Sequence, residues 1–286
     1  MVLWDKPAGP SSHQALGILK RTFGTRRVGH AGTLDPPATG LLVCAVGKAT
    51  RLLQDVEARE KEYLFAVRFG TVTTTLDTAG EVIVVRPVPD LGAVDWNGLL
   101  AGFTGVLSQV PPAVSAIKVD GVRAYDRVRQ GEEVELAARS IEVHRFVRET
   151  ELEASMPGIE PRDLLFRVNC SKGTYVRSLA RDLGELLGCG ACVSLLRRTA
   201  IGPWRVPDVP SETPAEPRMQ PVERFFSEWP RFPVDLAGRE ALCRGKAIES
   251  PLPDAALALA IGDEALATGR VVAGQFHPEV LLVDAR

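Results

Sequence analysis

Short apolar runs separated by glycine and polar turns are the main feature of the first two hundred residues. Runs of this length that are rich in β-branched and aromatic residues predict strands. The predicted strands cover residues 41–46, 63–69, 81–85, 139–152, 163–171 and 193–196. The 63–69 and 81–85 strands lie on either side of a turn at 71–80. An extended segment at 111–121 ends in an Asp120-Gly121 turn.

Helical periodicity is limited to a few segments. Ser11 and Gln14 have the spacing of a capping box and begin a predicted helix that ends before Gly24. Shorter helices are predicted at 95–103 and 124–130.

A further helix is predicted from about Tyr175 to Leu187, with Gly188 ending it. Its buried stripe consists of Val176, Leu179, Leu183 and Leu186. Arg177 lies in the first turn, where the helix dipole disfavours a cation. We therefore expect Arg177 to have an anionic partner elsewhere in the fold.

Residues 26–40 contain three glycines and two prolines in fifteen residues, which excludes a regular helix or a central strand. Pro36 restricts Asp35 to an extended conformation, so that this carboxylate is presented from a stiff backbone. Such a loop suits a catalytic carboxylate. The alternative, which these residues alone favour, is an Asx-turn in which Asp35 bonds its own backbone.

The composition is that of an ordinary globular protein, with 45% hydrophobic and 24% charged residues over 286 positions. The chain shows no signal-like apolar segment and no run of membrane-spanning length, so we expect a cytoplasmic protein. The five cysteines are irregularly spaced, which argues against a disulfide framework. Cys189 and Cys192 have CxxC spacing, but no second pair or nearby histidine completes a metal site.

The net charge of −2 is unevenly distributed. Residues 1–30 carry five Lys/Arg against one acid, and residues 164–206 carry seven against two. Two basic segments of this kind permit one positive face for phosphate contacts, although they do not by themselves identify a nucleic-acid partner.

The C-terminal third has a different character. Eight prolines between 203 and 233 indicate a linker or irregular connection. Residues 234–286 hold short strands, notably at 271–273 and 280–283, and predict a small β-rich module.

Taken together, the motifs resemble the bacterial tRNA pseudouridine-55 synthase family, the TruB branch. The matching stretches are Asp5-Lys6-Pro7, Gly29 to Pro36, Ala38-Thr39-Gly40, Lys61-Glu62-Tyr63, Thr75 to Gly80, Pro111-Pro112, Lys118, Gly121 with Tyr125, Arg129 with Gly131, Cys170 to Arg177, Gly188 to Ala191, and Leu196-Arg197-Arg198. Pro37 stands where the family usually has leucine. The tail from 234 is a weak and short match to a PUA-like module.

The resemblance implies an α+β fold with a mixed, mostly antiparallel central sheet flanked by helices. It implies a catalytic domain at 1–205, a Pro-rich linker at 206–233 and a PUA-like RNA-binding module at 234–286. The implied reaction converts uridine 55 in the T-loop of tRNA to pseudouridine: the base flips out, its glycosidic bond breaks, and C5 bonds to C1′. No cofactor, metal or protein partner is implied, and we expect a monomer that binds the T-arm of tRNA.

By the same resemblance, Asp35 is the catalytic carboxylate, whether it attacks the sugar or base or removes a sugar proton. Arg177 is its partner and should lower its pKa. Tyr63 stacks on the uracil, and His30 fills the gap that the flipped base leaves. The remaining residues expected to contact RNA are Lys6, Gly32, Thr33, Lys61, Lys118, Tyr125, Arg129, Lys172, Tyr175, Leu196 and Arg197.

Two other functions remain open at this point. One is a hydrolase that uses His30 and Asp35 with an unidentified serine, although no nucleophile motif is present. The other is a tRNA-binding or tRNA-folding protein without turnover, for which Asp35 would be dispensable.

Overall fold

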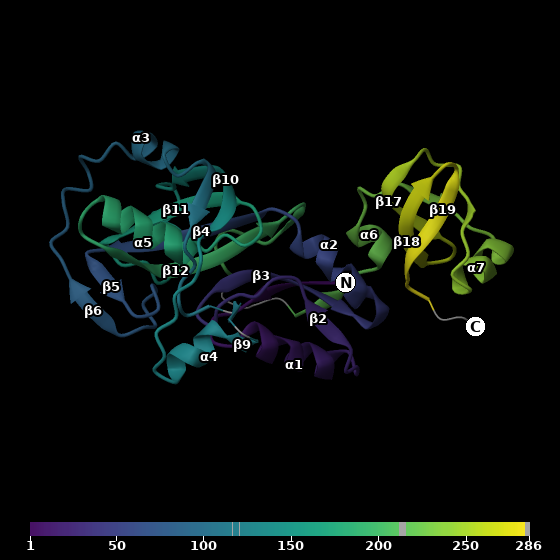
Figure 1. The fold of residues 1–286 in the computed structure, drawn as a ribbon, viewed down its shortest axis with the longest axis horizontal. Helices are drawn as coiled ribbons and strands as arrows, with labels where there is room; N and C mark the ends of the chain where they lie inside the picture. Colours follow the sequence, from purple (N-terminus) through teal and green to yellow (C-terminus); the bar gives the residue numbers. More distant parts are fainter. Residues whose placement is uncertain (116, 120, 212–215, 284–286) are drawn as a thin grey trace.

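A ten-stranded sheet organises the N-terminal two thirds of the chain (Figure 1). The structure is a computed structural model that describes residues 1–115, 117–119, 121–211 and 216–283. The strand order is β14-β1-β3-β12-β4-β11-β10-β7, with β2 on β3 and β13 on β12. All these pairs are antiparallel except β3 with β12. The expected mixed, mostly antiparallel sheet is therefore confirmed.

The strands of this sheet are β1 (Val2–Lys6), β2 (Val28–His30), β3 (Thr39–Val46), β4 (Lys61–Phe69), β7 (Gly105–Gln109), β10 (Arg139–Arg148), β11 (Asp163–Cys170), β12 (Ala191–Ile201), β13 (Trp204–Arg205) and β14 (Arg218–Met219). The helices that accompany it are α1 (Ser12–Thr22), α2 (Leu53–Glu57), α3 (Trp96–Ala101), α4 (Ala124–Arg129) and α5 (Val176–Leu186), with short 3-10 segments η1 (Gly47–Leu52) and η2 (Glu153–Ser155). Each predicted helix is present, with ends shifted by one or two residues.

Helices pack on the sheet through separate buried clusters. Helices α3 and α5 cover β4, β11 and β12, where Phe65, Phe166 and Leu183 are buried together. Helix α1 packs Leu16 and Leu19 on β1 and β3. Its capping box forms as expected, with both hydrogen bonds between Ser11 and Gln14, and Gly24 follows its end at φ +62°.

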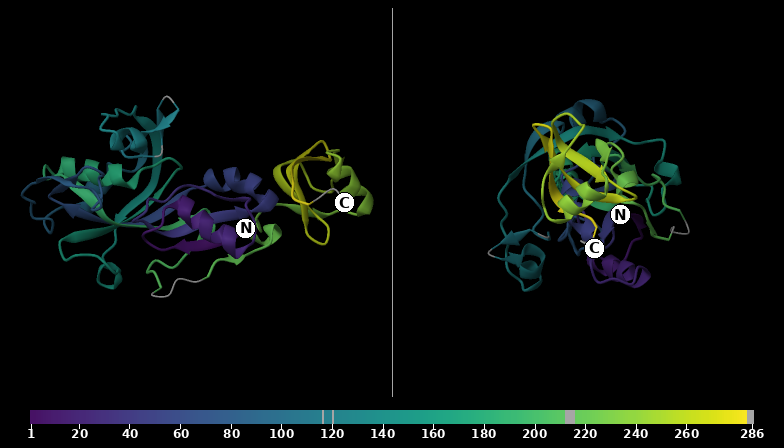
Figure 2. Two further views of the ribbon diagram at one scale, coloured as in Figure 1. Left: turned by 90° about the horizontal axis from the view of Figure 1, so that it is seen from below. Right: turned by 90° about the vertical axis from the view of Figure 1, so that its right-hand side faces the viewer.

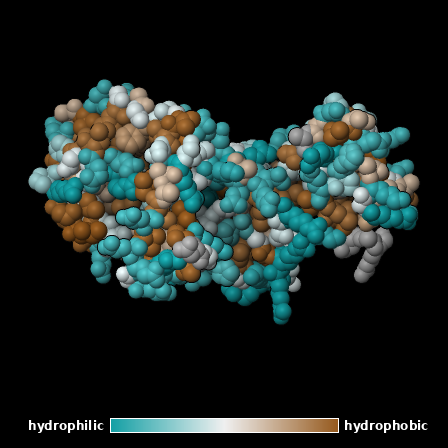
Figure 3. All heavy atoms as spheres, in the orientation of Figure 1, coloured by the Kyte–Doolittle hydropathy of each residue, from teal (hydrophilic) through white to brown (hydrophobic). Residues whose placement is uncertain are grey.

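The predicted strand at 81–85 is present and belongs to a small separate sheet. Strand β6 (Val82–Val85) pairs with β5 (Thr71–Thr73), not with β4, and forms a separate two-stranded sheet. Gly70 at φ +79° donates its N–H to Gly190 O and turns the chain away from the end of β4. Apolar residues gather at the end of the molecule where β5 and β6 lie, on the left in Figure 3, and Val82, Ile83 and Val85 are exposed.

Strands β8 (Lys118–Val119) and β9 (Val122–Arg123) form a small hairpin before α4. Of the expected Asp120-Gly121 turn between them, Asp120 lies outside the described residues.

The Gly-rich loop that carries Asp35, between β2 and β3, is held by hydrogen bonds to Gly9 and Ser12. Gly9 N donates to Pro36 O at 2.9 Å. Ser12 Oγ bonds both the N–H and the carbonyl of Leu34, at 2.8 and 3.0 Å. The loop therefore holds a defined conformation next to α1.

Gly40 lies at the centre of the sheet, paired with Lys6 on one side and Arg198 on the other. Its φ is +101°, and a Cβ there would lie 2.8 Å from Arg198 N and closer still to Arg198 O. We expect Gly40→Ala to destabilise the protein by the positive-φ cost of about 1–3 kcal/mol plus roughly 1–3 kcal/mol of overpacking. Denaturant unfolding measures this loss.

Gly9→Ala is the matched control, because Gly9 has nearly the same φ, +105°, but nothing within 4 Å of an added Cβ. It should cost only the positive-φ part. Equal losses in the two variants would contradict the role assigned to the close approach of β3 and β12.

The C-terminal module is a five-stranded sheet at the far end of the elongated molecule (Figures 1 and 2). Its elements are β15 (Arg231–Pro233), α7 (Leu236–Cys243), β16 (Ile248–Glu249), β17 (Ala255–Ile261), β18 (Ala265–Val272) and β19 (Gln275–Leu281). The β-rich character is as predicted, whereas the periodicity of the sequence did not reveal α7.

The described part of the Pro-rich stretch contains regular elements. It contains β14 and α6 (Val222–Phe225), and Phe226 stacks on Trp229 at 4.0 Å. These aromatic side chains belong to one buried cluster with Leu259 and Ala265 of the module. The expected domain limits at 205 and 233 remain a prediction. In the described part of the chain, no helix is long and apolar enough to cross a membrane.

Candidate active site

Asp35 and Arg177 meet where the Gly-rich loop approaches the start of α5. Asp35 Oδ2 lies 2.9 Å from Arg177 Nη2. The guanidinium is 5% exposed, whereas the Asp35 side chain is partly open to solvent. The first-turn cation thus has the anionic partner that its helix position predicts.

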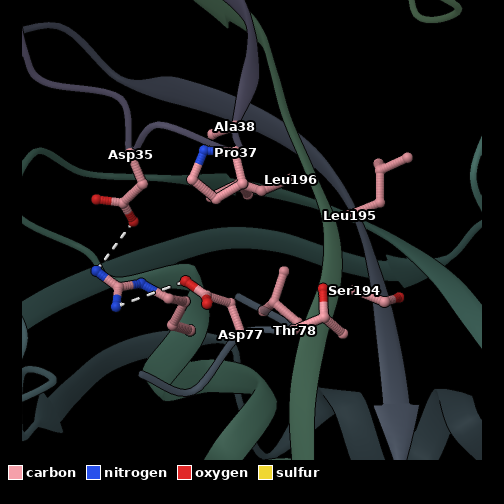
Figure 4. Close-up of a pocket in the computed structure, with 10 residues that line it drawn as sticks. Asp35, Pro37, Ala38, Asp77, Thr78, Ser194, Leu195 and Leu196 are labelled. Atoms are coloured by element: carbon pink, nitrogen blue, oxygen red, sulfur yellow. Dashed lines mark ion pairs between the residues drawn. The ribbon is translucent and has the colours of Figure 1, made fainter. Parts of the chain in front are cut away.

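Arg177 is fixed from three directions. Nη1 donates to Thr75 O at 2.7 Å, and Nη2 donates to Val114 O at 3.0 Å. Asp77 Oδ2 lies 3.9 Å from Nη1, and Figure 4 shows Asp35 and Asp77 pointing toward the guanidinium from two sides. Because these contacts fix the guanidinium, its ion pair with Asp35 restricts the orientation of the Asp35 carboxylate.

The sequence reasoning did not select Asp77 as a site residue. Its Oδ1 accepts bonds from Thr75 Oγ1 and Ala79 N, which closes a turn. The turn is tied to β12 because Thr78 N donates to Val193 O. This long-range pairing, together with the bond from Arg177 Nη1 to Thr75 O, places the Asp77 carboxylate beside Arg177.

The expected direction of the Asp35 pKa was wrong. Burial raises the pKa of Asp35 above its ordinary value, and the Arg177 guanidinium opposes this rise without cancelling it. Asp77 adds a further upward contribution through like-charge repulsion. Ionised Asp35 therefore requires a higher pH than an exposed carboxylate does.

Asp35 opens onto a cleft of about 770 Å³ between the Gly-rich loop, α2, β10 and the start of α5. Tyr63 and Lys61 line it from β4, whereas Glu62 points to the opposite face and binds Arg167 and Arg205. This alternation agrees with the predicted strand. Tyr63 is 8% exposed, and burial raises the pKa of its hydroxyl.

Arg198 forms part of the cleft wall and was not singled out from the sequence. Nε donates to Leu41 O at 2.8 Å, and Nη2 donates to Gly32 O at 3.0 Å. Its guanidinium thus joins β12 to the loop that carries Asp35.

Comparison with known proteins assigns the family. The sequence profile described as TruB family pseudouridylate synthase (N terminal domain) matches residues 20–176. The chain belongs to this family. The profile described as tRNA pseudouridylate synthase B C-terminal domain matches residues 177–213.

Relatives named tRNA pseudouridine synthase B support the TruB assignment. The protein of Thermobifida fusca is 50% identical over 206 residues, which is 72% of this chain and 70% of the relative. That of Corynebacterium aurimucosum is 44% identical over 256 residues, or 87% and 84% of the two chains. Among solved structures, a chain of a Cbf5-Nop10-Gar1 complex superposes with a TM-score of 0.66 at 25% identity, covering 99% of this chain and 85% of that one.

As a TruB-family member, the protein is an isomerase. The residues that we expected to contact RNA fall into three groups by their position relative to the cleft. Gly32, Thr33, Lys61, Lys172, Tyr175 and Leu196 line the cleft. Lys118, Tyr125 and Arg129 lie outside it on β8 and α4, with the Tyr125 ring beside Arg129 at 5.5 Å.

The third group, Lys6 and Arg197, is fully buried, which does not fit the direct RNA contact that we expected. Lys6 Nζ donates to the carbonyls of Pro7, Pro10 and Pro36, and burial lowers its pKa to about 8. Arg197 makes a bidentate ion pair with Asp5 at 2.9 and 2.6 Å. Both side chains use their donors inside the fold, where they support the loop and the sheet.

His30 ends β2, just before the cleft wall. Burial lowers its pKa, so the neutral imidazole is favoured at neutral pH, and Nδ1 is buried without a protein partner. Among the described residues, no group of three or more His, Cys, Asp or Glu side chains is arranged to hold a metal ion. Cys189 and Cys192 are buried next to α5.

Proposed function

We propose that this protein converts uridine 55 in the T-loop of tRNA to pseudouridine, with Asp35 as the catalytic carboxylate. The observation that carries the proposal is the Asp35–Arg177 ion pair at 2.9 Å on the wall of a cleft that also contains Tyr63. The relatives named tRNA pseudouridine synthase B support tRNA as the substrate.

A base inside a folded T-loop is out of reach of a carboxylate in a cleft, so the uridine must flip out. Unstacking costs a few kcal/mol, which stacking on an aromatic ring offsets by roughly 1–3 kcal/mol. Tyr63 supplies such a ring in the cleft. His30 lies nearby and would fill the gap in the loop.

The isomerisation needs no redox step and no hydrolysis. The N1–C1′ bond breaks, the uracil turns within the cleft, and C5 bonds to C1′. The C5 proton then leaves and N1 takes up a proton, so that product and substrate are isomers. Asp35 must be ionised to act as nucleophile or base, and Arg177 holds one of its oxygens in place.

Exposed Lys118, Arg129 and Lys172 would contact phosphates of the T-arm. A catalytic domain that ends near 205, an RNA-contacting C-terminal module and a monomeric state also belong to this proposal. A tRNA substrate agrees with the cytoplasmic location that the sequence predicts.

The decisive experiment uses an unmodified tRNA transcript tritiated at uridine C5. We expect release of one tritium per tRNA to water, and no release from a transcript with cytidine at position 55. Tritium release that persists with cytidine 55 would refute uridine 55 as the modified position, although it would still show isomerase activity. Tight binding without release would favour the non-catalytic alternative, and hydrolysis without release would favour the hydrolase.

Turnover should survive exhaustive chelation with EDTA once the tRNA has been refolded, because the proposed chemistry uses only Asp35 and its neighbours. The measurement is tritium release before and after chelation. Activity that is lost and that zinc alone restores would contradict this expectation and point to Cys189 and Cys192 as ligands.

A further inference from the structure

Arg198 is a buried cation that has no counter-ion among the described residues. Its side chain is 1% exposed. In the described part of the chain, no Asp or Glu oxygen lies within 4 Å of its guanidinium. Its partners include the carbonyls of Leu41, Gly32 and Thr33, and it also interacts with the Tyr63 hydroxyl. Burying a charge that is not neutralised is costly, which makes Arg198 a candidate for binding a charged ligand or transition state.

Arg198 contrasts with the arginines around it. Arg177 is paired with Asp35, and Arg197 is paired with Asp5. Because side chains alternate along a strand, the adjacent residues Arg197 and Arg198 lie on opposite sides of β12. Only Arg198 of these two lines the cleft.

One edge of the guanidinium has capacity to spare. Nε and Nη2 donate to carbonyls at 2.8 and 3.0 Å, whereas the carbonyl contact of Nη1, to Thr33 O, is long at 3.5 Å. A Cβ at Gly32 would lie 3.4 Å from Nη1, and glycine leaves that space free. Lys61, a second buried cation on the cleft wall, donates to the carbonyls of Glu57 and Arg59 and adds to the positive field.

The proposed reaction places negative charge on the uracil by every route open to Asp35. If Asp35 attacks C1′ or removes the C2′ proton, the electron pair of the N1–C1′ bond stays on the uracil and spreads to O2 and O4. If Asp35 adds to C6, the C5=C6 pair moves onto O4. In each case the negative charge leaves the uracil when C5 bonds to C1′, after which the C5 proton is lost and N1 takes up a proton.

We propose that Arg198 is a further catalytic residue, whose Nη1 donates to a uracil carbonyl oxygen and stabilises the charge that develops on the detached base. This rests on the proposed function. A fixed cation in a site shielded from water needs no reorganisation when the charge forms. Its carbonyl partners hold the guanidinium in place without neutralising it.

The test compares leaving groups. A fluorine at C5 withdraws electrons and makes the uracil a better leaving group, so less external stabilisation is needed. Single-turnover consumption of uridine 55, and of 5-fluorouridine at the same position, is measured by nucleoside digestion and chromatography at saturating enzyme. Arg198→Gln should slow the uridine substrate about 100-fold or more, as loss of an oxyanion donor does, and the fluorinated substrate at least tenfold less.

Arg197→Gln is the matched control, since it removes an equally buried guanidinium that binds Asp5 on the far side of the strand. Its loss, of whatever size, should be the same for both substrates. Arg198→Lys keeps the charge but cannot contact the carbonyls of Leu41, Gly32 and Thr33 together. It should recover part of the rate on the uridine substrate. Melting temperature and tRNA affinity are measured for every variant.

Equal losses on the two substrates for Arg198→Gln, or a lysine variant as slow as the glutamine variant, would overturn the inference and leave Arg198 as a support of the loop. If Arg198→Gln does not fold, the same comparison is made with Arg198→Lys. Its rate loss should then be larger on the uridine substrate than on the 5-fluorouridine substrate, and equal losses would overturn the inference. A wild-type protein that converts neither substrate would instead refute the proposed function.

Discussion

Asp35→Asn should reduce single-turnover conversion of uridine 55 by about 10⁴-fold or more, because the amide keeps the shape of the side chain but can act neither as nucleophile nor as base. Binding of tRNA should stay within about tenfold of wild type, since phosphate contacts supply most of the affinity. Quench-flow assays at high enzyme concentration and filter binding measure the two quantities separately.

Asp90→Asn is the matched control, because Asp90 is an exposed carboxylate that closes a loop turn by accepting from Gly92 N. Its rate should equal that of wild type. Measurable product from Asp35→Asn at a rate near wild type would refute the catalytic role. A large loss of binding would show that the ion pair with Arg177 holds the cleft together.

The parts of the site that were predictable from sequence are those with local causes. The capping box at Ser11 and Gln14 uses bonds within one turn, and it forms as the spacing predicts. Pro36 and the glycines around it mark the Asp35 loop without any knowledge of the fold. The position of Arg177 in the first turn of α5 predicted an anionic partner, and that partner is Asp35.

The parts that were missed depend on contacts far apart in the sequence. Arg197 and Arg198 are the same residue type side by side, and only the position of Asp5 and of the Gly-rich loop decides which one faces the cleft. Asp77 reaches Arg177 because its turn pairs with Val193 on β12. No periodicity in the sequence reports such a pairing.

The wrong direction for the Asp35 pKa has a related cause. A guanidinium partner is visible in the sequence pattern, whereas the extent of burial is set by the packed fold. Burial is the larger of the two effects here, so the pKa rises although the partner is present.

Arg177→Gln should slow turnover by about 10- to 150-fold at neutral pH, since a hydrogen bond to a charged group is worth roughly 1.5–3 kcal/mol. It should also move the acid limb of the pH–kcat/KM profile to higher pH. Ionised Asp35 is lost as the pH falls through its pKa, which burial already raises. Removing the guanidinium removes the largest opposing influence, so the pKa rises further.

Arg181→Gln is the control, one turn further along α5, where Arg181 binds Val110 O at 3.1 Å and Asp182 at 2.8 Å. It should leave the acid limb unchanged. Arg177→Lys should lie between wild type and Arg177→Gln, because an ammonium keeps the charge but cannot serve Asp35, Thr75 O and Val114 O together. An acid limb that stays in place, or moves to lower pH, in Arg177→Gln would show that a group other than Asp35 controls the profile. The Asp35 carboxylate would then not be the base or nucleophile whose ionisation limits the reaction.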